Sequence, residues 1–210
     1  MHINTPSLFV EINNLNFIFT VVTYSENQEI KIDENNICPI VGIKNNKFIN
    51  INETSQLIKK NVQLLEDKLN YIFKEVTIIL DNLNFSCINI SGFKKLNGSQ
   101  VLKENISYIL NSLKFTISEN EKNKNILHIF NSKSILDGVK TENLPIGLFG
   151  DFYNHELSFF LIANNDLKNI NQVFNRNNLK VNKIFLKSFI EGAQLTKKHN
   201  IETFLKIDIN

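Results

Sequence analysis

LDGVKTENLPIGLFG, the stretch from Leu136 to Gly150, directly follows a short apolar region that reads as a strand, Ile126 to Phe130. Asp137 and Gly138 form a turn signal, and Pro145 fixes φ where a second bend begins. The pattern predicts two β-edges joined by a compact, ordered crossover. For Asp137 we expect a turn-stabilising role rather than that of a functional acid.

The first third of the chain predicts a sheet, then a helix, then a buried strand. The expected strands are Leu8–Ile12, Phe17–Tyr24, Ile37–Ile43 and Phe48–Ile51. Ile58, Val62, Leu65, Leu69 and Ile72 recur at three- and four-residue intervals, which is typical of one apolar helical face. We expect this helix to be capped by Thr54 and to lead into strand Val76–Leu80. The order is that of an α/β layer.

The pattern restarts at Phe85, and the middle third reads as a small α+β unit. Its expected parts are a strand from Phe85 to Ile90, a helix capped by Ser99, a polar and mobile stretch from Ser118 to Asn125, and strands Ile126–Phe130 and Leu157–Ile162. The ring of Phe149 is expected to lie in the core of this unit.

After Asn164 the α/β period returns. Leu167, Ile170, Val173 and Phe174 predict a helix, which strand Val181–Leu186 follows. Ser188 and Glu191 have capping-box spacing at the start of a last helix. The first and last thirds therefore belong to one layer, and residues 85–164 are inserted into it.

Composition limits the class of protein. The chain of 210 residues is 42% hydrophobic, with 17 Phe and a net charge of +2, which indicates a globular protein. Arg176 is the sole arginine, so we expect no nucleic-acid partner. Cys38 and Cys87 are expected to be reduced residues of the core. The sequence shows neither a signal peptide nor a membrane-spanning run, and we expect a cytoplasmic location.

Four segments together resemble the FtsA family of bacterial cell-division proteins. They are Val41–Glu66, which holds a Gly-Ile-Lys turn at Gly42 to Lys44, the stretch Leu136–Gly150, the segment Ser158–Thr196, and Phe204–Asn210. The resemblance implies an α/β fold that is half of an actin-like (ribonuclease H-like) fold with an inserted SHS2-type subdomain. Residues 1–84 and 165–204 would form subdomain 1A, residues 85–164 subdomain 1C, and residues 205–210 the start of subdomain 2A. The second lobe and the family's C-terminal membrane helix would follow Asn210, so we expect a truncated or reduced relative.

By the same resemblance, two phosphate hairpins would surround ATP and Mg²⁺. Actin-like hairpins carry an Asp followed two positions later by a Gly, because backbone N–H groups must reach the phosphates. Here the first hairpin reads Glu11, Asn13 and Asn14, and the second begins with Asp208 and ends at Asn210. Asn tolerates positive φ, so the turns could form, but its side chain would crowd a phosphate. We expect ATP binding to be weak or absent.

Other candidate residues favour structural roles. His128 reads as a packed strand histidine without an acid or Ser partner, and His2, His155 and His199 are scattered. The lysine pairs at 59–60 and 197–198 are expected on solvent faces of helices. The sequence contains no P-loop, HExxH or GxSxG motif, and we expect no autonomous enzyme.

The resemblance implies a non-enzymatic adaptor of the division machinery. Its partners would be FtsZ and membrane division proteins, with head-to-tail self-association through subdomain 1C, at the inner-membrane septum if the full-length protein has the family's C-terminal helix. An exposed edge strand in the inserted module suits capture of cytoplasmic tails by strand addition. Two alternatives remain: the first lobe of an ATP-dependent kinase or chaperone-like ATPase, and the pilus-assembly relative, which shares the actin-like core.

Overall fold

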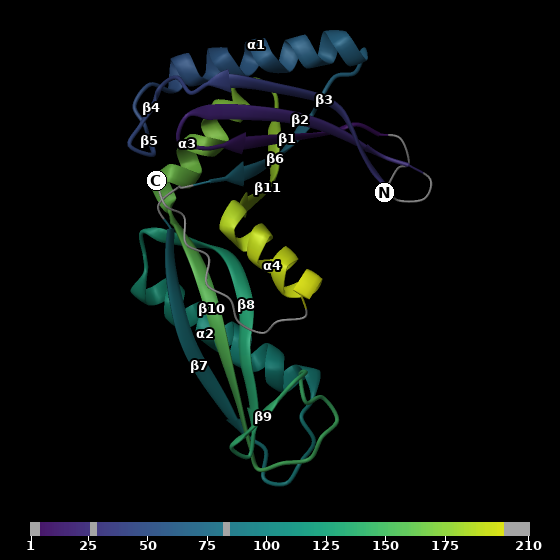
Figure 1. Cartoon of the computed structure of the whole chain (residues 1–210). Coiled ribbons are helices and arrows are strands. Elements are labelled where there is room, and N and C mark those ends of the chain that lie inside the picture. Colours follow the sequence, from purple (N-terminus) through teal and green to yellow (C-terminus); the bar gives the residue numbers. More distant parts are fainter. Residues whose placement is uncertain (1–4, 26–28, 82–84, 200–210) are drawn as a thin grey trace. The chain divides into compact units, whose positions relative to one another are not determined.

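The computed structural model describes residues 5–25, 29–81 and 85–199. These residues belong to two compact units (Figure 1). Unit 1 comprises Met1–Leu83 and Asp166–Asn210, and unit 2 comprises Asn84–Asn165.

Unit 1 is built on a five-stranded mixed sheet. Its strands are β1 (Ser7–Ile12), β2 (Asn16–Tyr24), β3 (Ile30–Pro39), β6 (Glu75–Leu80) and β11 (Lys180–Leu186), in the order β11-β6-β1-β2-β3. Strands β1, β6 and β11 run parallel, whereas β2 and β3 are antiparallel to their neighbours. The carboxyl ends of three strands therefore meet at one edge of the sheet.

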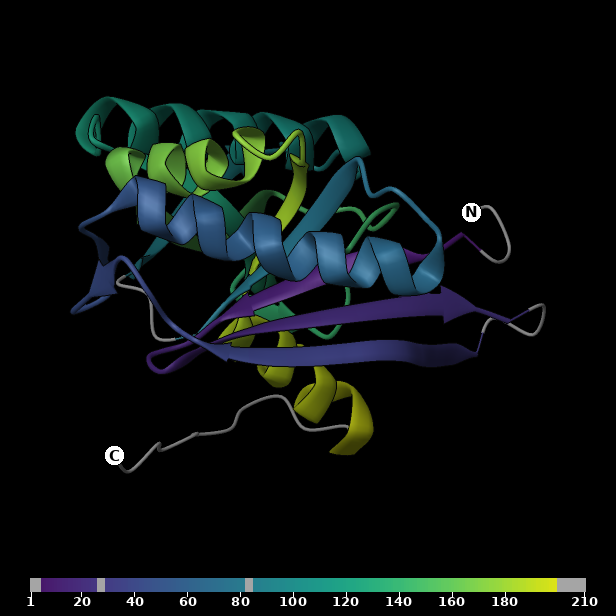
Figure 2. The same cartoon turned by 90° about the horizontal axis from the view of Figure 1, so that it is seen from above.

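Helices lie on both faces of this sheet. Figure 2 shows α1 (Ile51–Leu69) and α3 (Asn164–Asn175) on one face and α4 (Lys187–His199) on the other. The apolar stripes predicted for α1 and α3 are confirmed at Ile58, Leu65 and Phe174, which are buried. They pack on a sheet face formed by side chains such as Val10 and Phe19. The prediction was wrong for Ile72, because α1 ends at Leu69 and Ile72 is exposed.

The beginning of α1 differs from the sequence prediction. Asn50, not Thr54, is the N-cap, and its side chain accepts the N–H groups of Asn52 and Glu53. Thr54 lies one turn inside the helix, where its hydroxyl approaches the carbonyl oxygens of Val41 and Asn50. The strand predicted from Phe48 to Ile51 is wrong, because only Phe48 is in a strand and Ile51 begins α1. Phe48 belongs to a separate hairpin of β4 (Ile43–Lys44) and β5 (Lys47–Phe48).

Gly42 explains why the chain turns before this hairpin. Its φ is +75°, a left-handed conformation that favours glycine. A Cβ at this position would also collide with the carbonyl oxygen of Asn50 and the hydroxyl of Thr54. The Gly-Ile-Lys turn is thus fixed by close packing against the start of α1.

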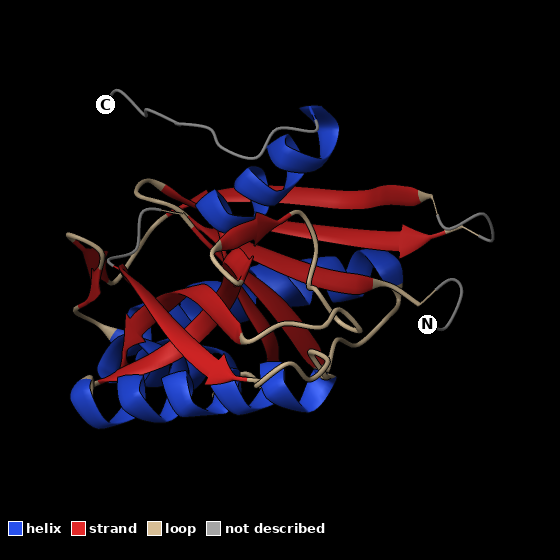
Figure 3. Cartoon of the chain, turned by 90° about the horizontal axis from the view of Figure 1, so that it is seen from below, coloured by secondary structure: helices blue, strands red, loops and turns tan. Residues whose placement is uncertain are grey.

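Unit 2 is an antiparallel sheet covered by one helix. Its strands β7 (Phe85–Lys95), β8 (Lys124–Leu136), β9 (Val139–Thr141) and β10 (Phe152–Ala163) have the order β7-β10-β8-β9, and α2 spans Lys103–Asn120 (Figure 3). The core between sheet and helix includes Ile109, Leu113, Tyr153, Leu157 and Phe159. A mixed α/β class, as predicted, is confirmed.

Three predictions for unit 2 are wrong. Ser99 is not a cap, because α2 begins at Lys103 after Leu102, whose N–H bonds to Asn105. The polar stretch Ser118–Asn125 is not a connecting segment throughout, because Ser118–Asn120 belong to α2 and Lys124–Asn125 to β8. Phe149 is 69% exposed and is not part of the core, and its backbone pairs with Gln100 in an isolated bridge.

Two smaller predictions also fail. Cys87 is exposed rather than buried, because it lies on the face of β7 that points away from α2, whereas Cys38 is half-buried. Ser188 lies inside the first turn of α4, which begins at Lys187, so it does not occupy the position before the helix. Both cysteines are free, as expected.

The turn chemistry of the Leu136–Gly150 stretch is confirmed. Asp137 and Gly138 have φ of 50° and 82° and connect β8 to β9. The Asp137 carboxylate accepts the backbone N–H groups of Asp151 and Phe152 at 2.9 and 2.8 Å. Asp137 therefore ties the turn to the start of β10.

Candidate functional site

The candidate site lies in unit 1, where the parallel strands end. Ile12, Leu80 and Leu186, the last residues of β1, β6 and β11, pair in register across the sheet. The next residues along the chain, which include Asp81 and Lys187, therefore occupy one edge. In α/β sheets this carboxyl edge is the usual place for a ligand.

An ion-pair cluster fills part of this edge. Lys187 Nζ lies 2.8 Å from Oε1 of Glu11 and 2.9 Å from Oδ2 of Asp81. The hydrogen bond to Glu11, assisted by Asp81, raises the pKa of Lys187 above its ordinary value despite the partial burial of the ammonium group. The cluster thus joins β1, β6 and the start of α4 through charged hydrogen bonds.

The side chain of Asn13 closes the β1–β2 hairpin. Its Oδ1 accepts hydrogen bonds from the backbone N–H groups of Leu15 and Asn16 at 2.9 and 2.8 Å. The backbone N–H of Asn13 donates to the carbonyl oxygen of Asn16. Neither Asn13 nor Asn14 has positive φ, so the turn forms without the left-handed conformation that we considered from sequence. The N–H groups of Asn13, Leu15 and Asn16 are consequently bonded within the hairpin.

A hollow of about 300 Å³ lies beside this tip. Its lining comprises Asn13, Asn14, Ile40, Ile43, Asn45 and Asn46. Four of these six side chains are amides, which are neutral and bind an anion less strongly than Lys or Arg. Among the described residues, no group of three or more His, Cys, Asp or Glu side chains is placed to hold a metal ion.

The predicted site residues are therefore partly brought together. Glu11, Asn13 and Asn14 share the end of β1, and Asp208 lies outside the described residues. Sequence reasoning missed Asp81 and Lys187, the two partners that complete the Glu11 cluster. Their positions directly after two predicted parallel strands were the available signal.

The geometry does not fit a phosphate held as in actin-like hairpins. A phosphate needs free backbone N–H groups at the turn, and Asn13 bonds to two of them. The Lys187 ammonium already neutralises part of the negative charge that would attract a divalent cation, because it contacts one oxygen of Glu11 and one of Asp81. The cluster acts as an internal ion pair.

The histidines do not contribute to this edge. His128 lies on β8 and His155 on β10, both in unit 2, and burial lowers the pKa of each. His155 is 2% exposed, and neither of its ring nitrogens has a hydrogen-bond partner among the described residues. The packed strand role expected for His128 extends to His155, which the sequence did not single out.

Comparison with known proteins yields one curated relative. The chain is 24% identical over 175 residues to cell division protein FtsA from Buchnera aphidicola subsp. Schizaphis graminum, a match that covers 83% of this chain and 41% of FtsA. No protein-family model matches the chain. The chain thus spans less than half the length of this relative, and the resemblance to FtsA noted from sequence is confirmed.

A solved structure supports the fold. A chain of the PilM-PilN type IV pilus biogenesis complex superimposes with a TM-score of 0.61 at 13% identity, covering 91% of this chain and 50% of that one. At this identity the likeness establishes the fold alone. The partial actin-like fold predicted from the sequence is confirmed.

Proposed function

We propose that this chain is a non-enzymatic adaptor of the bacterial division machinery, in which unit 1 is a scaffold and unit 2 makes the protein contacts. The observation that carries the proposal is the Lys187 ammonium between Glu11 and Asp81, which uses the acids of the ligand edge for an ion pair. Together with the bonded hairpin of Asn13, it leaves unit 1 poorly suited to ATP and Mg²⁺.

Unit 2 corresponds, in this proposal, to the SHS2-type subdomain 1C, and unit 1 to subdomain 1A. The entry and exit strands of unit 2 are neighbours, because Phe85 at the start of β7 pairs with Ile162 near the end of β10. Such a module can be inserted into a host layer with little disturbance. The partners are FtsZ and membrane division proteins, with self-association through unit 2 and a peripheral location at the septum.

The described part of the chain has no helix with the length and apolar character needed to cross a bilayer.

Localisation tests the proposal. A fluorescent fusion of the full chain, expressed in a dividing bacterium, should concentrate at the division site, and a chain in which a short linker replaces Phe85–Asn164 should not. Circular dichroism and urea unfolding of the shortened chain verify that unit 1 is folded. Pull-down with purified division proteins scores the contacts. Should the shortened chain localise and bind as the full chain does, the role belongs to unit 1 and the assignment to unit 2 is wrong.

A second candidate is an adaptor of pilus assembly, which the structural likeness to the PilM-PilN chain favours. The same fusion discriminates between the two, because a pilus adaptor should not follow the division ring. The alternative of a first-lobe ATPase fits the structure less well. Nucleotide binding at the edge of unit 1 would use Glu11, Asp81 and the hairpin N–H groups, and these make contacts within the protein.

A further inference from the structure

The two larger sheets have four edge strands, and three of them carry features that oppose further pairing. β3 ends in Pro39 and has a register shift where it pairs with Val22. β11 has a register shift at Lys183, and β9 is only 3 residues long. Bulges, proline, lysine and short length are the usual protections of an exposed edge.

The first nine residues of β7 lack these protections. The strand is 11 residues long and pairs with β10 from Phe85 to Lys95 without any register shift. In the part of the chain that the structure describes, it pairs on one side only, and its first nine residues carry no charge. A straight, uncharged edge of this length is a template for an added strand.

Helix α2 runs beside β7 and adds an aromatic wall. Lys94 Nζ lies 4.3 Å from the ring centroid of Tyr108, and a Cβ on Gly92 would collide with Ile109, so α2 passes close to β7. Phe115 is seven positions beyond Tyr108, which puts both rings on one side of the helix. They are 58% and 68% exposed.

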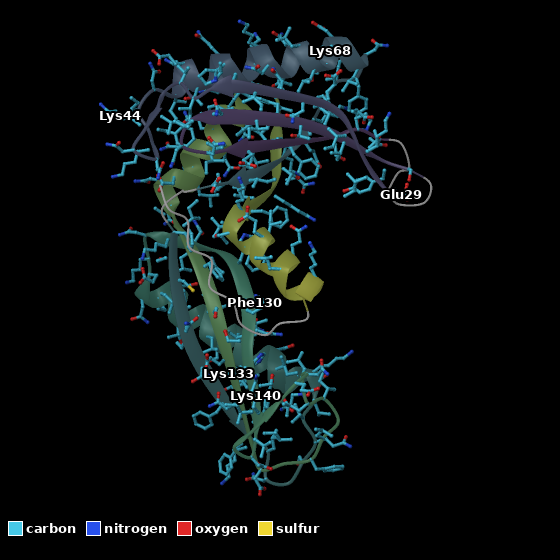
Figure 4. All side chains as sticks on the ribbon, viewed as in Figure 1. Glu29, Lys44, Lys68, Phe130, Lys133 and Lys140 are labelled. Carbon is cyan, nitrogen blue, oxygen red and sulfur yellow. The ribbon has the colours of Figure 1, made fainter. Side chains whose placement is uncertain are left out.

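These rings point to the chemistry of the occupant. An added strand directs alternate side chains to the side of the sheet that α2 covers, where apolar groups would contact Tyr108 and Phe115. Exposed aromatic side chains of this kind often dominate the energy of an interface. Phe130, Lys133 and Lys140, labelled in Figure 4, belong to the opposite edge of the sheet, where β9 pairs only with Ser134–Leu136 of β8. β8 has two register shifts against β10, so among the described residues this edge is less regular than β7.

Charge gives the added strand a direction. Lys94 and Lys95 end β7, and they are the only charged residues of the strand. All pairs in the unit 2 sheet are antiparallel, so an antiparallel addition places the N-terminal part of the new strand beside these lysines. Acidic residues in that part complement them.

We propose that the outer edge of β7 captures an extended peptide of a partner protein by antiparallel strand addition. The peptide begins with acidic residues next to Lys94 and Lys95 and continues with alternating apolar residues that contact Tyr108 and Phe115. This rests on the proposed adaptor function and names the surface and the partner chemistry for it.

The test uses the full chain and a fluorescein-labelled synthetic peptide of about ten residues, the length that pairs with β7. Two Asp residues precede alternating Ile and Thr. Fluorescence anisotropy should show saturable binding, and the same peptide N-methylated at alternate backbone positions should bind at least about tenfold more weakly, because it cannot pair with the edge.

Side-chain variants locate the site. Tyr108→Ala and Phe115→Ala should each weaken binding by about fivefold or more. Phe149→Ala removes a ring of equal exposure, 69%, elsewhere in unit 2 and should leave the affinity unchanged. The double change Lys94→Glu and Lys95→Glu should lower the affinity for the acidic peptide and raise the affinity for a peptide that begins with two lysines. Circular dichroism confirms that each variant is folded.

Three results overturn the proposal: equal affinity of the methylated and unmethylated peptides, no effect of either aromatic variant, or a dimer of the full chain in light scattering that Phe115→Ala dissociates. The last result assigns the edge to a second copy. Localisation is scored separately. If the peptide binds but the fusion does not locate to the septum, the division role is refuted and the β7 site stands. If the fusion locates to the septum but the peptide does not bind, only the β7 site is refuted.

Discussion

Lys187 and Glu11 are 176 positions apart in the sequence, and their side chains are 2.8 Å apart in the fold. The same ammonium group reaches Asp81, so one lysine at the start of α4 holds two strand ends. A contact of this kind makes α4 part of the sheet's carboxyl edge.

Removing the ammonium group should destabilise unit 1. In Lys187→Met, Glu11 and Asp81 are left as half-buried carboxylates without their shared donor, at a cost of about 1–3 kcal/mol in the free energy of unfolding. Urea unfolding measures it as a lower midpoint at unchanged slope. Lys183→Met, an exposed position on β11, is the matched control and should change stability by less than about 0.5 kcal/mol. Equal effects of the two variants would show that the ion pairs are unimportant.

ATP should bind weakly or not at all. Calorimetric titration of the full chain with Mg-ATP should show no binding, or binding with a dissociation constant far above 1 μM, the value that corresponds to about −8 kcal/mol. Asn13→Gly should not restore binding, because Lys187 still pairs with both acids. Micromolar binding by the unmodified chain would contradict the proposed non-enzymatic role.

Phe149→Asp should leave unit 2 folded, because the ring is 69% exposed and a carboxylate there remains hydrated. Phe159→Asp buries a charge at a fully buried core position and should unfold the unit. Thermal unfolding followed by circular dichroism compares them. A loss of several degrees in the melting temperature of Phe149→Asp would place its ring in a contact that the exposure does not reveal.

The stability of unit 2 should depend on pH through His155. Burial lowers its pKa in the folded state, whereas in the unfolded chain a histidine titrates near about 6.5. The unfolded state therefore binds the proton first, and stability falls as the pH drops from about 6.5 through the lowered folded value. His128, whose pKa is also lowered, contributes with the same sign.

His155→Leu isolates this effect. The imidazole has no hydrogen-bond partner in the part of the chain that the structure describes, so leucine should fit without leaving a polar group unpaired. Urea midpoints measured between pH 5 and 8 should then vary less than in the unmodified chain. An unchanged pH dependence would assign the acid sensitivity to other groups.

Periodicity predicted the elements of this fold well where one face of an element is buried. The stripes of α1 and α3 follow from a 3.6-residue repeat, which local sequence records directly. Helix starts were missed because capping depends on backbone position: Asn50 and Thr54 are both good caps, and only the packing of Gly42 decides between them.

Burial within loops could not be predicted from sequence. Phe149 is large and apolar, but its backbone bridges to Gln100, a long-range contact that no local pattern encodes, and its ring is exposed. Glu11 and Asn13 were found through resemblance to a known family. Lys187 was missed because its partners come from β1 and β6, and the register of parallel strands is a tertiary property.

The pairing of Phe85 with Ile162 also affects how unit 1 can fold. Strand β11 must find β6 across the inserted segment, a loop of roughly 100 residues if unit 2 is still unfolded and of roughly 20 if β7 and β10 have already paired. Since each halving of a loop lowers the closure entropy cost by about 0.6 kcal/mol, early folding of unit 2 would favour closure by about 1.4 kcal/mol. Early folding of the inserted unit would then speed the pairing of β6 with β11, which lie on either side of it in the sequence.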